Sequence, residues 1–134
     1  MLVKEMIESH PDVGGDMNPQ LVAVIVSAYR CAQACTSCAD ACLAEESVAD
    51  LRQCIRSDLD CATICTATGE AASRRTGSNE ALLRELLEVC RSACRTCAEE
   101  CERHAGMHEH CRICAEACRS CEAACADALP TIGR

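Results

Sequence analysis

The chain has 134 residues and a net charge of −8, and sixteen of its residues are cysteine. A chain of this length can bury a core of its own, so we expect one domain over residues 1–134. The negative charge argues against a nucleic-acid partner, and no apolar run approaches the ~18 residues that a membrane span needs.

The first two predicted elements are a short helix and a long one. Residues 2–9 carry apolar side chains at helical spacing, and His10-Pro11 ends that pattern. Asn18 as an N-cap and Pro19 at the first helical position predict a long helix over 19–43. Its inner stripe is predicted to be Leu21, Val24, Ala28, Cys31, Cys35, Cys38 and Cys42.

A second long helix is predicted over about 48–75. Ser47 and Asp50 resemble a capping box at its start, with aspartate in place of the usual glutamate. Its inner stripe is predicted to be Leu51, Cys54, Asp58, Cys61, Cys65, Thr68 and Ala72. Asp58 therefore occupies a slot that the period would give to a cysteine.

Two more helices follow a turn at Gly77, with Asn79 as a new N-cap. The third is predicted over about 79–104, with the stripe Leu83, Leu87, Cys90, Cys94, Cys97, Cys101 and His104. The fourth is predicted over about 107–128, with the stripe Cys111, Cys114, Cys118, Cys121 and Cys125, and Met107 continues that stripe if the helix reaches it. Steps of four and three alternate along these cysteines, which is the spacing of one helix face.

Four helices of similar length with short connections predict an all-α, antiparallel up-down-up-down four-helix bundle, preceded by the short extra helix. In such a bundle the cysteine-rich parts of all four helices start from the same end, or pole. The other pole gathers a hydrophobic plug of Leu21, Val24, Leu83, Leu87 and Leu129. Ile25, Val26 and Leu86 are predicted to point outward, where they would serve a homo-oligomer.

The cysteines are predicted to be reduced. Charged residues interrupt the N-terminal segment where a signal peptide needs an apolar core, so we expect a cytoplasmic protein. Cytosolic thiols stay reduced, and a disulfide between residues three or four apart closes only a tiny loop. A disulfide framework is therefore the less favoured interpretation.

Thiols facing each other across a core predict a soft metal ion. Cysteine can also pack as a small hydrophobe, but leucine would fill the volume better and would not oxidise. Multiple Cu(I) ions suit a continuous strip of thiolates, because the single positive charge of each Cu(I) balances the single negative charge of one thiolate. A multi-site zinc protein is the alternative, although four thiolates around each Zn²⁺ leave two buried negative charges.

The loop between the third and fourth helices adds weaker candidate ligands. His104, His108 and His110 lie there with Met107, at the predicted open pole, and imidazole and thioether groups both bind copper. Asp58 is predicted either to bind edge ions weakly or to accept a hydrogen bond from a thiol. No nucleophile–base arrangement stands out, so we do not expect an enzyme, and a thiol redox protein would need one cysteine with a depressed pKa.

These segments together resemble the cytosolic bacterial copper storage proteins. The matching motifs are Cys31-x3-Cys35-x2-Cys38-x3-Cys42, Cys54-Ile55-Arg56 through Asp60-Cys61-x3-Cys65, Cys90-x3-Cys94-x2-Cys97-x3-Cys101-x2-His104, and Met107-His108-Glu109-His110-Cys111-Arg112-Ile113-Cys114. The resemblance implies storage of many Cu(I) ions along the axis of a four-helix bundle and often a homotetramer. It also implies that the three histidines lie at the entrance.

Overall fold

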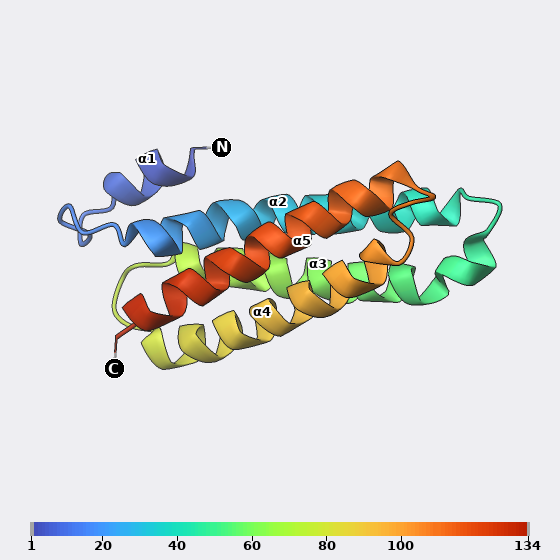
Figure 1. The fold of residues 1–134 in the computed structure, drawn as a ribbon. Coiled ribbons are helices and arrows are strands. Elements are labelled where there is room, and N and C mark those ends of the chain that lie inside the picture. The colour runs from blue at the N-terminus through green and yellow to red at the C-terminus, as the bar shows by residue number, and fades with distance from the viewer. Residues whose placement is uncertain (1, 134) are drawn as a thin grey trace.

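The computed structural model describes residues 2–133, in which four long helices lie side by side (Figure 1). They are α2 (Pro19–Leu43), α3 (Arg52–Ser73), α4 (Glu80–Glu102) and α5 (Glu109–Ala128). The short helix α1 (Val3–Glu8) precedes them, and two 3-10 turns, η1 (Val48–Leu51) and η2 (Leu129–Thr131), precede α3 and follow α5. Residues 2–133 contain no strand. The predicted all-α bundle with a short extra N-terminal helix is confirmed.

The start of α2 follows the predicted capping pattern. Asn18 has a left-handed backbone, with φ of 52°, and its side-chain oxygen accepts a hydrogen bond from the Leu21 N–H at 3.2 Å. Pro19 takes the first helical position, where its missing N–H costs no intrahelical bond. Local sequence therefore fixes where the longest helix begins.

The start of α3 differs from the prediction. Ser47 makes no side-chain capping bond, so the predicted capping box is wrong. Instead the Asp50 N–H donates to the Ser47 carbonyl oxygen at 2.8 Å, and residues 48–51 form the 3-10 turn η1. This turn already satisfies the backbone donor that the side chain would have capped.

The helices on either side of the 103–108 loop are shorter than predicted. α4 ends at Glu102, so His104 lies beyond the helix, and α5 begins at Glu109, so Met107 lies before it. The prediction that Met107 continues the α5 stripe is therefore wrong, and its side chain is 77% exposed. Asn79 is also not a side-chain cap of α4; its amide donates to the Ala71 carbonyl oxygen instead.

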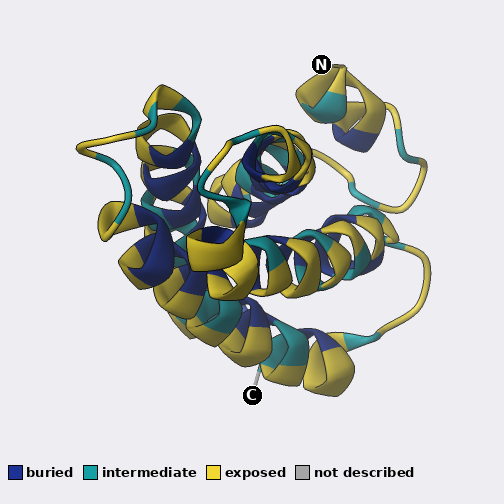
Figure 2. Ribbon diagram, turned by 90° about the vertical axis from the view of Figure 1, so that its right-hand side faces the viewer, coloured by how far each residue is buried: buried dark blue, intermediate teal, exposed yellow. Residues whose placement is uncertain are grey.

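Buried residues lie on the inner faces of the helices, as the view along the bundle shows (Figure 2). One end of the core is apolar: Leu21, Val24, Leu83 and Leu87 are buried, and Leu129 packs partly buried against them. The predicted hydrophobic plug therefore closes the end of the bundle where α2 and α4 begin. The cysteines line most of the rest of the core, together with Leu51, Asp58, Thr68 and several alanines.

Ile25 was predicted to point outward, but it is buried. The reason is α1, which returns along α2 and places Ile7 in the same hydrophobic cluster as Ile25 (Figure 1). A helical-wheel projection of the four-helix core cannot show that α1 covers Ile25, because α1 lies outside the four-helix arrangement.

The single aromatic side chain marks a close approach between α2 and α3. A Cβ atom at Gly69 of α3 would lie 2.9 Å from Cζ of Tyr29 on α2. Real Cβ atoms essentially never come so close to a neighbour, so only glycine fits beneath the ring. This contact accounts for a helix-weakening residue in the middle of α3.

By length and composition alone, α2 is apolar enough to cross a membrane. Its buried residues, however, are those that face the shared core, from Leu21 to Cys42. A core helix of a bundle has this same composition, so the apolar character of α2 is accounted for by packing against α3 and α5.

Candidate metal centre

All sixteen cysteines line the interior of the bundle, and each is at most 1% exposed. Every one is a free thiol, and neighbouring Sγ atoms lie 3.6 to 4.0 Å apart. A disulfide would bring the two sulfur atoms to about 2.05 Å. The prediction of unoxidised thiols converging on a common axis is therefore confirmed.

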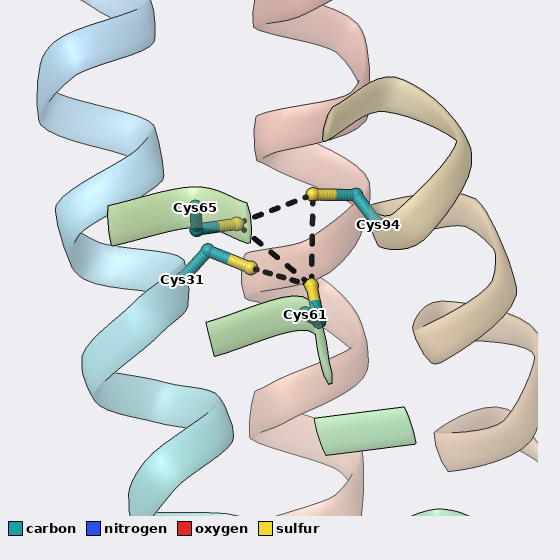
Figure 3. Close-up of side chains that lie close together, drawn as sticks. All are labelled: Cys31, Cys61, Cys65 and Cys94. Atoms are coloured by element: carbon teal, nitrogen blue, oxygen red, sulfur yellow. Dashed lines mark hydrogen bonds between the residues drawn. The ribbon is translucent and has the colours of Figure 1, made fainter. Parts of the chain in front are cut away.

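Figure 3 shows how thiols from different helices meet. Cys61 of α3 lies 3.8 Å from Cys31 of α2, from Cys65 one turn along α3 and from Cys94 of α4. Cys65 and Cys94 are 3.6 Å apart. The four sulfur atoms surround a point that one soft metal ion would share.

Such groups of four overlap along the axis. Within each group, the sulfur atoms all lie within 4.8 Å of one another. The groups include Cys31-Cys61-Cys65-Cys94, Cys31-Cys35-Cys61-Cys118, Cys35-Cys97-Cys114-Cys118, Cys38-Cys42-Cys54-Cys111 and Cys65-Cys90-Cys94-Cys121. Four of the five groups are linked because Cys31, Cys35, Cys61, Cys65, Cys94 and Cys118 each belong to two of them. The group at the entrance, Cys38-Cys42-Cys54-Cys111, shares no cysteine with these four; it connects to them through Cys101, whose Sγ lies 3.7 Å from Cys54 Sγ and 4.0 Å from Cys97 Sγ. The ligands therefore form a continuous track in which one sulfur can serve two ions.

This sharing favours monovalent copper over zinc in separate tetrahedral sites. A tetrahedral zinc site with bonds of about 2.3 Å places its sulfur atoms roughly 3.8 Å apart, so any single group of four also fits zinc. Four thiolates around Zn²⁺, however, leave two negative charges, which are costly to bury. Cu(I) with bridging thiolates leaves the core close to neutral, and the overlapping groups supply those bridges.

Asp58 lies within this track, in the slot where the period predicts a cysteine, and it is fully buried. Its Oδ1 atom accepts hydrogen bonds from the thiols of Cys97 at 3.1 Å, Cys114 at 3.3 Å and Cys101 at 3.5 Å. Of the two predicted roles, this structure shows the hydrogen bond to thiols. Oδ2 is buried without a hydrogen-bond partner among residues 2–133. Burial raises the pKa of Asp58 to about 8.

His110 is the histidine that reaches the thiols. Its Nδ1 atom lies 3.4 Å from Cys38 Sγ, 3.6 Å from Cys111 Sγ and 4.0 Å from Cys42 Sγ. His110 occupies the first turn of α5, at the end of the bundle opposite the plug. Its imidazole therefore stands where the thiol track meets the surface.

The other two histidines flank this opening. His108 stacks on His110, with ring centroids 5.3 Å apart. His104 Nε2 lies 3.0 Å from Oε2 of Glu100, a carboxylate that is itself buried. All three predicted histidines thus gather at the open pole, whereas Met107 extends away from it into solvent.

Two carboxylates at this pole were missing from the sequence prediction. Glu45 contacts both His108 and His110, and Glu100 contacts His104. Glu45 lies in the α2–α3 connection, where a charged residue is ordinarily solvated. Topology alone could have placed Glu45 near the histidines, because the α2–α3 connection and the histidine-rich loop lie at the same end of an antiparallel bundle.

Copper loading is expected to release about one proton for each thiol that binds. Burial raises the pKa of Cys42 to about 11 and raises the pKa of Cys111 above its usual range, so both thiols are protonated at neutral pH. Protons therefore compete with Cu(I), and affinity will be weaker at pH 5.5 than at pH 7.5. A pH-indicator dye in weak buffer, read during an anaerobic Cu(I) titration, measures the release; loading without release would contradict this prediction.

Comparison with known proteins places this geometry in one family. The family model of the copper storage proteins matches residues 17–130, which include all sixteen cysteines. A structure of the copper storage protein Ccsp from Streptomyces lividans, loaded with 10 copper equivalents, is 53% identical with a TM-score of 0.91. That alignment covers 96% of this chain and 98% of the other.

Two further structures are similar. The cytosolic copper storage protein from Streptomyces lividans with five coppers is 55% identical, with a TM-score of 0.85 over 90% of this chain and 100% of the other. Cu(I)-bound copper storage protein BsCsp3 is 35% identical, with a TM-score of 0.70 over 78% of this chain and 93% of the other. The chain belongs to the copper storage protein family and binds many copper ions through the cysteines that line its core.

Proposed function

We propose that this chain is a cytosolic reservoir in which residues 1–134 act as one domain. Cu(I) fills a single continuous thiol track through the end that carries the histidines. The observation that carries the proposal is the overlap of the groups of four sulfur atoms, because separate metal sites would not share ligands. The free thiols and the cytosolic Streptomyces lividans relative support the compartment. Membership in a storage family agrees with the expectation that the chain is not an enzyme.

The proposed ligands are the sixteen cysteines together with His110 Nδ1 at the entrance. His104 and His108 flank the same entrance and serve as capture sites. Asp58 has one buried oxygen without a partner, so we place it as an internal ligand or proton holder within the track. Met107, exposed at the tip of the loop, is assigned a role only in the first encounter with an ion.

Anaerobic titration of the reduced protein with Cu(I) against a chelator is expected to saturate above ten ions per chain. If each ion takes two sulfurs and each sulfur serves two ions, the sixteen thiols hold about sixteen ions. Saturation at four or fewer would contradict a continuous track and favour separate sites. Equal zinc and copper occupancy, with tight zinc competition, would favour the zinc alternative.

We also propose that the chain forms a homotetramer. Support comes from large apolar side chains exposed on the long helices, Leu59 on α3 and Leu82 and Val89 on α4. A native mass spectrum of protein from copper-fed cells reports the number of subunits and the copper content together. A monomer at micromolar concentration would overturn the proposed assembly and leave the reservoir proposal in place.

A further inference from the structure

Glu45 joins two histidines of the entrance through one carboxylate oxygen. Its Oε2 atom lies 2.8 Å from Nε2 of His110 and 2.9 Å from Nδ1 of His108. Glu45 follows the end of α2, whereas both histidines belong to the start of α5. The contact therefore ties together two segments that are more than sixty residues apart in sequence.

The chemistry of a carboxylate determines which nitrogen carries the proton. A glutamate carboxyl in a partly exposed turn is ionised at neutral pH and can only accept hydrogen bonds. Nε2 of His110 must then carry a hydrogen. A neutral imidazole has only one N–H, so Nδ1 of the same ring presents a lone pair. That lone pair faces Cys38 at 3.4 Å and Cys111 at 3.6 Å.

The preceding helix, α2, does not favour a negative charge at Glu45. A negative charge just beyond a helix C-terminus meets the negative end of the helix dipole, which is unfavourable. At the N-terminus of α5 the same charge is favourable, and there it meets His108 and His110. The backbone N–H of Glu45 donates to the Cys42 carbonyl oxygen at 3.3 Å, which holds the main chain of Glu45 beside a cysteine at the mouth of the track.

We propose that Glu45 is a positioning residue for copper entry, holding the His110 ring so that the Nδ1 lone pair points at Cys38 and Cys111. The first Cu(I) ion then meets one nitrogen and two sulfur donors already in place. The carboxylate itself does not touch the ion. This inference rests on the proposed function, in which copper enters at this end.

The test compares Glu45→Ala with Glu46→Ala, a matched variant of the exposed neighbour that loses the same charge. Three quantities are measured on reduced protein: the ring ¹⁵N shifts of His110 without copper, the loading rate from a Cu(I)–chelator complex, and the copper capacity. Glu45→Ala is expected to load about tenfold more slowly, as when an outer-shell partner of a metal-binding histidine is removed. In Glu45→Ala the two ring ¹⁵N shifts of His110 should also move towards their average, while the copper capacity stays unchanged. Glu46→Ala should match the parent protein in all three quantities.

Glu45→Gln separates positioning from charge. Its amide oxygen still accepts the hydrogen bond from His110, so loading close to the parent rate is expected. Loading as slow as that of Glu45→Ala would mean that charge alone matters and would overturn the inference. An unaltered His110 tautomer and rate in Glu45→Ala would also overturn it. A low capacity in the parent protein would instead refute the reservoir, and the copper-free ¹⁵N shifts would still decide the role of Glu45.

Discussion

Replacing Asp58 by asparagine is expected to abolish most of the loss of stability that the copper-free protein suffers between pH 5 and pH 8. Burial raises the pKa of Asp58 to about 8 from an ordinary value of 3.8. Below the lower value the carboxyl is protonated in both folded and unfolded chains, so it imposes no penalty. Above that value the unfolded chain releases the proton while the folded chain keeps it, and the free energy of unfolding falls by about 1.4 kcal/mol per pH unit.

The fall levels off once the pH passes 8, because the folded protein then ionises as well. Between pH 5 and pH 8 the loss is at most about 4 kcal/mol, from the integrated linkage relation. The asparagine side chain has no proton to release, so the Asp58→Asn variant should keep a nearly constant free energy of unfolding. Denaturant unfolding of reduced, chelator-treated protein at both pH values measures the difference.

Asp60→Asn provides the matched control, since Asp60 is exposed two residues further along α3 and pairs with Arg56 at the surface. Its pH dependence should follow that of the parent protein. If Asp58→Asn lost stability with pH as steeply as the parent, the buried carboxyl would not be the cause, and the thiols would have to account for it.

Leu87→Ala is expected to destabilise the copper-free protein by about 2–5 kcal/mol, the usual cost of truncating a buried leucine. Leu87 is fully buried in the hydrophobic plug, and the core has no large aromatic side chain that could move to fill the space. Without copper, the plug is the main part of the core built from large side chains, so its truncation should have a large effect.

Leu43→Ala at the end of α2 removes the same atoms from a residue that is 61% exposed. The change in its free energy of unfolding should be within about 0.5 kcal/mol of zero. Equal effects of the two substitutions would show that the plug does not carry the stability of the copper-free bundle. Copper capacity should survive in both variants, because neither side chain offers a ligand.

The helical stripes made most of the core predictable from sequence. Cysteines three and four residues apart can face only one side of a helix, and four such helices have only one shared interior. Every thiol, and Asp58 among them, can therefore be placed from its helical position without any knowledge of loop structure. It also located the plug, because Leu83 and Leu87 continue the α4 stripe beyond its last cysteine.

The entrance could not be derived in the same way. Contacts there join the α2–α3 connection to the α4–α5 loop, and neither segment has a period from which side-chain direction follows. Met107 was assigned to a stripe only because α5 was extended two residues too far. Glu45 was overlooked because a carboxylate in a turn is ordinarily solvated, and its partners are distant in sequence. Ile25 was misplaced for a related reason, since its cover comes from α1, outside the four-helix arrangement.

The close approach of Tyr29 to Gly69 provides an optical probe of the apoprotein. The chain contains no tryptophan or phenylalanine, and its cysteines are free thiols, so the near-ultraviolet circular dichroism of the copper-free protein comes from this one ring. The ring is wedged between α2 and α3, and its signal will disappear when these helices separate, even if both stay helical. Comparing that signal with the far-ultraviolet helix signal during unfolding will therefore show whether the interhelical contact and the helices are lost together.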